Sequence, residues 1–209
     1  SSRNSFINYC SVSFRSLQKI MISAILLAAG QSKRMDGENK LTKEIQGTPL
    51  IKHSVKNILA SSIDELIIVL GYQKEIIEKL IDKNEKIKFV FNKNFESGMA
   101  SSIKTGLNHL SENTKAFFIC LGDMPMVNQK TYNKLIEYKN NKEIIVPTYK
   151  GKQGNPVLFP KSMKKKLIMT IQGDFGAKKI LELNKNKLLN LETNDENIIK
   201  NFNTQDSFN

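Results

Sequence analysis

The chain has 209 residues, of which 32 are Lys or Arg and 20 are Asp or Glu, so its formal net charge is +12 at pH 7. This length allows one domain with a sizeable core, and no apolar run approaches the roughly 18 residues of a membrane-spanning helix. The cysteines, Cys10 and Cys120, match neither a metal-site spacing nor a disulfide framework, which excludes a disulfide-rich secreted domain and favours the cytoplasm.

The positive charge permits a polyanionic partner, either a nucleic acid or a phosphorylated small molecule. Only three residues are arginines, Arg3, Arg15 and Arg34, so the excess charge is almost all lysine and indicates a compositional bias. A single-stranded nucleic acid would need aromatic residues among the basic ones for stacking. The aromatic residues instead fall mostly in predicted buried strands. A Lys-rich nucleic-acid-binding module is therefore the non-enzymatic alternative, and we expect neither nucleic acid nor membrane as a partner.

Residues 1–20 contain no Asp or Glu and lack the long apolar stretch of a secretory signal. We expect a flexible extension, a leader, or translated sequence upstream of a start at Met21. No internal repeat or linker divides the rest of the chain, so residues 21–209 are predicted to form one domain.

The first predicted element is a buried strand over the apolar run 22–27. It is followed by the small residues 28–30, which let a backbone approach a ligand closely. Ser32 then offers a hydroxyl group, and Arg34 and Lys40 offer positive charge. Backbone N–H groups with two cations suit a polyphosphate. An ordinary strand and turn with basic surface residues is the alternative at this point.

Apolar runs and helical spacings predict the remaining elements in order. Thr48 is expected to cap a helix that Pro49 begins. Strands and helices alternate through the first 140 residues, which is typical of parallel βαβ units with helices on both faces of the sheet. The fold class is therefore α/β, a single three-layer, doubly wound, mostly parallel sheet. Further strands are predicted at 66–70, 87–91, 117–121, 144–147, 155–160, 187–191 and 198–202, and further helices near 76–81, 101–110, 128–140 and from 172–177 onward.

In such sheets ligands bind beyond the carboxyl ends of the strands. Gly30, Gly71, Asn92 and Asp123 each follow a predicted strand, so we expect them along one edge. Asp123 precedes Pro125 and could be a turn former. A carboxylate opposite a phosphate-binding loop is, however, where Mg²⁺ would be held together with phosphate oxygens. Because the chain has no P-loop motif, phosphate binding is expected to depend on the Gly30 loop.

The stretch Leu27–Met35, followed by Lys40, resembles the signature Leu-Ala-Ala-Gly-x-Ser-x-Arg-Met of the nucleotidyltransferases that finish the molybdenum cofactor. This resemblance extends over nearly everything from Met21 onward. It implies a Rossmann-like nucleotidyltransferase domain in which the terminal phosphate of molybdopterin attacks the α-phosphate of CTP and pyrophosphate leaves.

Three further segments carry the resemblance. Asn92 followed by Gly98–Ser102 is similar to a segment that lines the nucleotide, although serines at a helix start are also common caps. Residues 121–125 resemble the metal-binding segment. Residues 173–177 resemble Gly-Asp-x-Gly-Ala-Arg, with Lys178 in place of the arginine. Asp174-Phe175-Gly176 also matches the kinase metal-binding triplet, but no other kinase motif is present.

The resemblance implies a role for each matching residue. Arg34, Lys40 and Asp123 would be catalytic, with Mg²⁺ held by Asp123 and Asn201. The family has Asp-x-Asp-Thr-Pro where residues 201–205 read Asn-Phe-Asn-Thr-Gln, so the second metal ligand would carry no charge. Gly154, Asn155 and Asp174 would bind the acceptor. The nucleotide-binding residues would be Leu27, Ala28, Ala29, Gly30, Ser32, Gly71, Asn92, Ser101, Ser102 and Gly122.

The nucleotide and the acceptor stay open at this stage. Ala29 suggests cytidine, because the guanylyl branch of the family usually has Gly there. Guanylyl transfer from GTP to molybdopterin is the first alternative, and transfer to a sugar or lipid phosphate is the second. The expected partners are CTP or GTP, a molybdopterin-like phosphate acceptor, and a molybdoenzyme or its chaperone.

Overall fold

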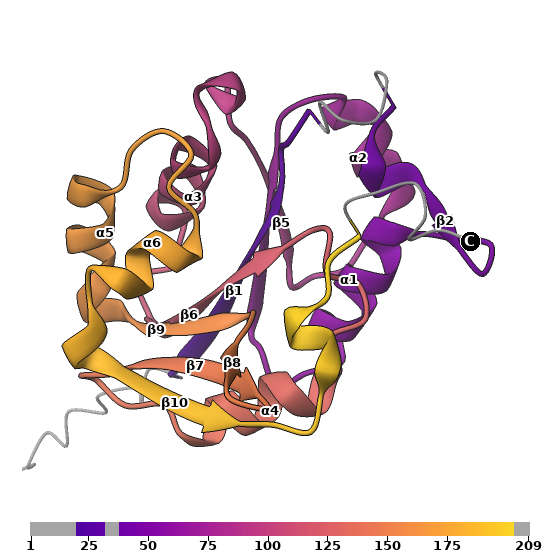
Figure 1. The fold of residues 1–209 in the computed structure, drawn as a ribbon. Helices are drawn as coiled ribbons and strands as arrows, with labels where there is room; N and C mark the ends of the chain where they lie inside the picture. The colour runs from indigo at the N-terminus through magenta and orange to yellow at the C-terminus, as the bar shows by residue number, and fades with distance from the viewer. Residues whose placement is uncertain (1–19, 32–37, 203–209) are drawn as a thin grey trace, which may run out of the picture.

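The computed structural model describes residues 20–31 and 38–202. Within these residues, one eight-stranded sheet has the order β10-β7-β9-β6-β1-β4-β5, and β8 pairs with β7 (Figure 1). A separate hairpin is formed by β2, Glu44–Ile45, and β3, Thr48–Pro49. The strands of the large sheet are β1 Met21–Ala28, β4 Glu65–Leu70, β5 Ile87–Phe91, β6 Thr114–Leu121, β7 Ile144–Tyr149, β8 Lys152–Gln153, β9 Val157–Pro160 and β10 Leu188–Glu192.

The sheet is mostly parallel, as predicted. Strand β1 runs parallel to both β4 and β6, β4 to β5, and β10 to β7. Strand β9 runs antiparallel to β6 and β7. All six residues of β4 are buried, because a central parallel strand is covered on both faces. This is why the central strands are continuous apolar runs in the sequence.

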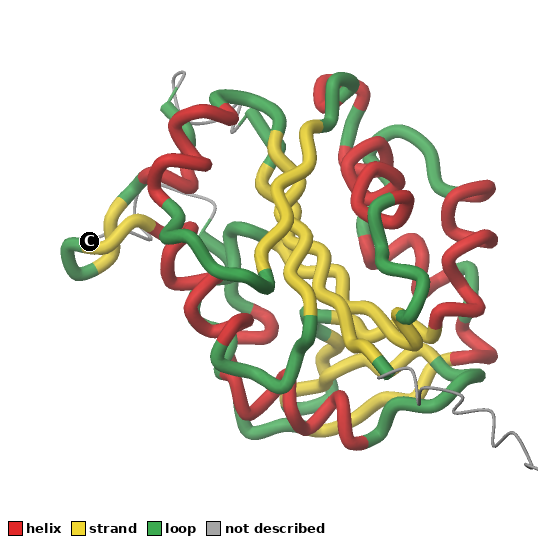
Figure 2. The backbone as a smooth tube through the Cα atoms, turned by 180° about the vertical axis from the view of Figure 1, so that it is seen from behind, coloured by secondary structure: helices red, strands yellow, loops and turns green. Residues whose placement is uncertain are grey.

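Helices cover both faces of the sheet, which confirms the three-layer architecture (Figures 1 and 2). Apolar residues of α1, α2 and α4 pack in one core cluster, and those of α3, α5 and α6 pack in the other. Short 3₁₀ turns, among them Lys40–Thr42 and Glu196–Ile199, connect the elements. The helices are α1 Leu50–Leu59, α2 Lys74–Leu80, α3 Met99–Asn108, α4 Gln129–Glu137, α5 Lys164–Thr170 and α6 Ala177–Glu182. No helix among the described residues is long and apolar enough to cross a membrane.

Two local predictions are wrong. Residues 198–202 do not form a strand, because the Asp195 side chain accepts a hydrogen bond from Asn197 N at 3.0 Å and caps the 3₁₀ turn Glu196–Ile199. Thr48 does not cap α1. It pairs with Ile45 in the hairpin, and Pro49 occupies the cap position without a side-chain hydrogen bond.

Candidate functional site

The carboxyl ends of the central parallel strands β1, β4, β5 and β6 lie side by side in the sheet. Ala28 lies opposite Leu70, Leu27 opposite Leu121, and Leu70 opposite Phe91. The residues that follow these strands therefore emerge at the same edge of the sheet, which confirms the prediction for Gly30, Gly71, Asn92 and Asp123. Strand β9 runs antiparallel to β6, so Gly154 and Asn155, which precede it, also reach this edge. Ser32 and Arg34 lie outside the described residues.

Lys40 and Asp123 form the charged centre of this edge. Lys40 Nζ lies 2.7 Å from Asp123 Oδ2, and their side chains are 14% and 20% exposed. The turn Lys40–Thr42 is held beside the loop after β6 by packing, since a Cβ atom on Gly122 would lie 3.1 Å from Leu41 Cδ2. An ammonium group can bind phosphate oxygens, and a carboxylate can bind a cation that is shared with them.

The small residues of the edge pack against one another. A Cβ atom on Gly71 would lie 2.6 Å from Phe95 Cβ, and one on Gly122 would lie 2.7 Å from Leu27 O. A Cβ atom on Gly71 would also lie 2.7 Å from Ala29 O, so neighbouring backbone leaves no room for a side chain at either glycine. The side chains of Ala28 and Ala29 are buried in the two cores, and that of Leu27 is half-buried against one of them. Space around Gly30 is open.

A hydrogen-bond network joins the end of β5 to the first turn of α3. Asn92 Nδ2 donates to Ser101 Oγ at 2.8 Å and to Ser102 Oγ at 3.0 Å. Asn92 Oδ1 accepts from Asn94 N at 3.0 Å. The N-cap residue of α3 is Gly98, which makes no side-chain hydrogen bond, so the serines do not serve as the N-cap. The buried Asn92 amide instead fixes one wall of the edge.

Asp174 lies beside this wall. Gly173 O accepts a hydrogen bond from Ala100 N at 2.9 Å, and a Cβ atom on Gly98 would lie 2.7 Å from Asp174 Oδ1. Asp174 is exposed, and the cap position of α6 belongs to Gly176. The segment before α6 is thus anchored across the start of α3.

The last described residues connect Asn155 with Asp123. Asn155 N donates to Ile198 O at 2.8 Å, and Phe202 N donates to Asp123 O at 2.9 Å. Asn201, the predicted second metal ligand, is exposed and directly precedes Phe202. Asn155 Oδ1 is buried and accepts no hydrogen bond in the described part of the chain. A buried acceptor of this kind is a candidate contact for a ligand N–H group.

Sequence reasoning missed Asn39, which precedes Lys40. Asn39 is 2% exposed, and its Oδ1 atom accepts a hydrogen bond from Leu41 N at 3.1 Å. Its Nδ2 atom is buried and makes no hydrogen bond within the described residues. The signal in the sequence is the position of Asn39, a capping residue directly before the candidate residue Lys40.

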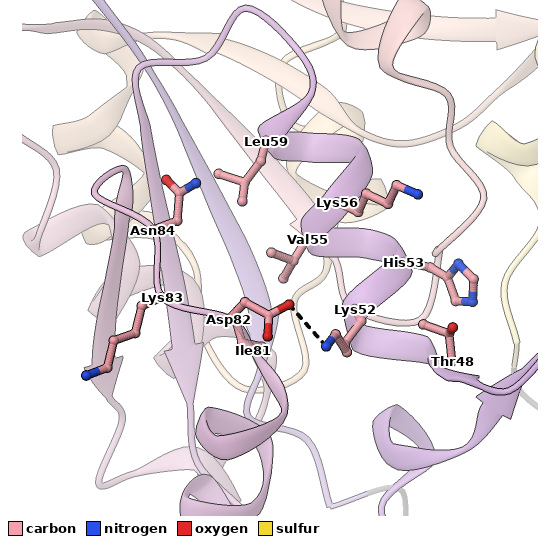
Figure 3. A pocket seen from close by; sticks show the side chains of 10 residues that line it. All are labelled: Thr48, Lys52, His53, Val55, Lys56, Leu59, Ile81, Asp82, Lys83 and Asn84. Atoms are coloured by element: carbon pink, nitrogen blue, oxygen red, sulfur yellow. Dashed lines mark ion pairs between the residues drawn. The ribbon is translucent and has the colours of Figure 1, made fainter.

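A pocket of about 350 Å³ lies elsewhere, between α1 and the turn after α2 (Figure 3). Val55, Leu59 and Ile81 contribute apolar surface, and Lys52 pairs with Asp82 at 3.1 Å. None of the predicted site residues lines it. The chemistry of the chain therefore points to the strand edge, not to this hollow.

Other groups with reactive side chains do not extend the site. Burial raises the pKa of the Cys120 thiol to about 12, against a smaller opposite effect of its hydrogen bond with Tyr132. The thiol is therefore protonated near pH 7 and is no nucleophile. No cluster of three or more His, Cys, Asp or Glu residues able to hold a metal occurs in residues 20–31 and 38–202.

Residues 24–190 match the family of MobA-like NTP transferase domains. The bifunctional protein GlmU of Staphylococcus epidermidis is 25% identical over 134 residues, 64% of this chain and 29% of that protein. A probable molybdenum cofactor guanylyltransferase of Thermococcus sibiricus is 31% identical over 131 residues, 61% of this chain and 62% of that protein. The chain thus spans less than two thirds of these relatives.

Solved structures share the fold. Rv0371c of Mycobacterium tuberculosis superposes with a TM-score of 0.79 at 22% identity, covering 90% of this chain and 95% of that one. A manganese complex of the same protein gives a TM-score of 0.76 at 20% identity, with 90% and 96% covered.

Proposed function

The chain belongs to the family of MobA-like NTP transferase domains, and we propose from this that it is a nucleotidyltransferase. The reaction transfers a nucleoside monophosphate from a nucleoside triphosphate to a phosphate acceptor and releases pyrophosphate. Relatives named probable molybdenum cofactor guanylyltransferases support molybdopterin as that acceptor. A molybdoenzyme or its chaperone as a further partner stays a prediction, as does the domain boundary at Met21.

The observation that carries the proposal is the pair of Lys40 and Asp123, 2.7 Å apart at the carboxyl edge of the sheet. A phosphate acceptor is already nucleophilic, so the reaction needs no general base, and catalysis consists of positioning and charge neutralisation. Lys40 suits the triphosphate and the departing pyrophosphate. Arg34, which precedes Lys40 in the sequence and lies outside the described residues, is proposed to assist it.

The donor set at this edge fits one Mg²⁺ ion. Such ions are commonly held by one or two carboxylates together with substrate phosphates and water, and Asp123 supplies one carboxylate. Asn201 could add an uncharged oxygen. The ion would neutralise charge on the phosphate oxygens. The manganese complex of Rv0371c supports a divalent metal in a protein of this fold.

The remaining edge residues are proposed to shape the substrate sites. Gly30 offers an open backbone for phosphate, and the network of Asn92, Ser101 and Ser102 forms the nucleotide wall. The buried Asn155 oxygen suits an N–H donor of the acceptor, and Asp174, beside the start of α3, is proposed as a further acceptor contact.

We favour GTP as the nucleotide because of the named relatives, which are 28 to 31% identical. Cytidylyl transfer is the second candidate and depends on Ala29. That residue is 3% exposed and its methyl group packs in the core beside α3, which weakens the physical basis for a choice of base at this position.

Pyrophosphate release tests the proposal. The protein is incubated with GTP, CTP, ATP or UTP, with and without molybdopterin and Mg²⁺. We expect release that needs all three components and is fastest with GTP. Faster release with CTP would favour the second candidate. Release with a sugar phosphate but not with molybdopterin would show that the acceptor is a sugar phosphate. No release with any combination of nucleotide and acceptor would reject the proposal.

A further inference from the structure

The loop that presents Asp123 is held by hydrogen bonds to three of its own carbonyl groups. Gly122 O accepts from Ser54 Oγ at 3.1 Å, and Pro125 O accepts from Asn57 Nδ2 at 2.8 Å. Asp123 O accepts from Phe202 N at 2.9 Å. The backbone on both sides of the carboxylate is therefore fixed by parts of the chain that are about 70 to 80 residues away in sequence.

Two of the three donors are side chains of α1. Ser54 and Asn57 are three residues apart, so they share one face of the helix. Both residue types are unfavourable inside helices, since their side chains compete for backbone hydrogen bonds. Here they lie within the helix Leu50–Leu59 and bond a loop that is distant in sequence. Their presence in α1 is explained by that loop.

Helix α1 is a rigid support for these contacts. Its residues Leu50, Ile51, Val55 and Ile58 are at most 6% exposed and pack in the core against the sheet. Ser54 is itself only 3% exposed. A group bonded to such a helix moves only with the core.

We propose that Ser54 and Asn57 are positioning residues that fix the Asp123 loop for metal and phosphate binding; this rests on the proposed function. Groups that hold a metal ligand from behind set its orientation, and losing one typically costs about 10- to 100-fold in metal affinity or activity. A displacement of about 1 Å at a catalytic group has effects of similar size. The α1 contacts are therefore expected to control how well Asp123 meets a cation.

The experiment compares Ser54→Ala and Asn57→Ala with a matched control, Ser61→Ala. Ser61 is also buried, at 5% exposed, but its hydroxyl group bonds Ile58 O at the end of α1. For each variant, Mn²⁺ affinity is measured by electron paramagnetic resonance in the presence of the triphosphate that supports turnover. Pyrophosphate release across a Mg²⁺ titration and thermal unfolding are measured in parallel.

We expect Ser54→Ala and Asn57→Ala to weaken Mn²⁺ binding by about tenfold or more and to raise the Mg²⁺ concentration needed for half-maximal turnover. Ser61→Ala should leave both unchanged even if it lowers the melting temperature. Because Asn57 is partly exposed, its variant should fold if Ser54→Ala does not. Parent-like metal affinity in a folded Asn57→Ala protein would overturn the proposal.

Combining Asn57→Ala with Asp123→Asn separates the positioning role from the proposed function. In Asp123→Asn the carboxylate is gone, so adding Asn57→Ala should cause little further loss of turnover, since residues that act as one unit are not additive. A full additional loss would show that Asn57 acts by another route. If Asp123→Asn itself turns over like the parent, the assignment of the metal site fails. If Asp123→Asn is impaired while both α1 variants bind Mn²⁺ like the parent, only the positioning role is wrong.

Discussion

At the scale of single residues, Lys40 is expected to compete with a metal cation for the carboxylate of Asp123. Both side chains are largely shielded from water, so their attraction is screened less than that of an exposed pair. A cation that binds Asp123 meets the positive charge of the Lys40 ammonium group on the same carboxylate. A triphosphate that draws Lys40 to its own oxygens would release the carboxylate, so nucleotide and metal are expected to bind cooperatively.

Replacing Lys40 by Gln should therefore separate metal binding from turnover. Without nucleotide, Mn²⁺ should bind Lys40→Gln more tightly than the parent, because the competing positive charge is gone. Turnover should nevertheless fall, by about tenfold or more, because the triphosphate loses a charged partner. Lys40→Arg, which keeps the charge, is the control and should not tighten Mn²⁺ binding. Weaker Mn²⁺ binding by Lys40→Gln would contradict the competition.

Asp123→Asn tests the carboxylate itself. The backbone hydrogen bonds of the loop do not involve the carboxylate, so the variant should fold with an unchanged circular dichroism spectrum. Pyrophosphate release at saturating Mg²⁺ should fall by about a hundredfold, as for the loss of one electrostatic stabiliser. Asp82→Asn, at an acid that is 88% exposed and away from the edge, is the control. Equal rates for the two variants would make Asp123 only a turn residue.

At the scale of elements, the turn at Glu196–Ile199 orders the last described segment. Asp195 precedes it and accepts hydrogen bonds from Asn128 N, Thr131 Oγ1 and Asn197 N, at 2.9, 2.9 and 3.0 Å. It thereby ties the segment to the start of α4. From there the chain reaches Asn155 through Ile198 and Asp123 through Phe202. The Asp195 carboxylate thus anchors the segment that contacts both Asn155 and Asp123.

Asp195→Ala should destabilise the protein, because it leaves these donors without their partner, at a cost of about 1–3 kcal/mol. For a domain of this size that lowers the melting temperature by roughly 2–4 °C per kcal/mol. Glu196→Ala is the control, because its ion pair with Lys200 lies at the surface with 54% exposure on each side and contributes little. Thermal unfolding of both variants measures the difference, and equal midpoints would contradict the anchoring role.

The elements also show which parts of the fold and the site are predictable from the sequence. The buried strands were predictable because their apolar runs are continuous, and Gly30, Gly71, Asn92 and Asp123 could be placed because each follows one. The apolar residues at 198–202 predict a strand and do not reveal that Asp195 caps a 3₁₀ turn at Glu196–Ile199. The roles of Ser54 and Asn57 could not be predicted, since the carbonyl groups they bond lie 68 residues away.

At the scale of the whole molecule, the two edges of the sheet differ. Opposite the candidate site, the buried Glu65 carboxylate accepts from Ser23 Oγ at 2.7 Å and from Ser111 Oγ at 2.6 Å, and Ser23 also bonds Thr114 at 2.8 Å. This polar cluster is satisfied by the protein itself. The site edge instead holds the buried Asn39 Nδ2 and Asn155 Oδ1 atoms, which make no hydrogen bond within residues 20–31 and 38–202. We therefore expect the first edge to stabilise the fold and the second to offer polar groups to the ligand of the proposed function.

Cys120 offers a probe of this whole structure. It lies in β6, is 2% exposed, and its raised pKa of about 12 keeps the thiol protonated. An alkylating reagent should therefore reach it only when the sheet opens, so its rate reports the population of opened molecules. The measurement uses Cys10→Ser, which leaves Cys120 as the only thiol, and a sample in urea sets the rate for the open chain.

Ligand binding should slow this alkylation, because a ligand that binds only the folded protein lowers the opened population. GTP with Mg²⁺ at about 100 times its dissociation constant should slow the reaction by about 100-fold. GTP without metal should protect less, since metal and nucleotide are expected to bind cooperatively at Asp123 and Lys40. An RNA oligomer at equal phosphate concentration is the control. Protection by RNA and none by any nucleotide would favour the nucleic-acid-binding alternative and overturn the assignment of the edge as a triphosphate site.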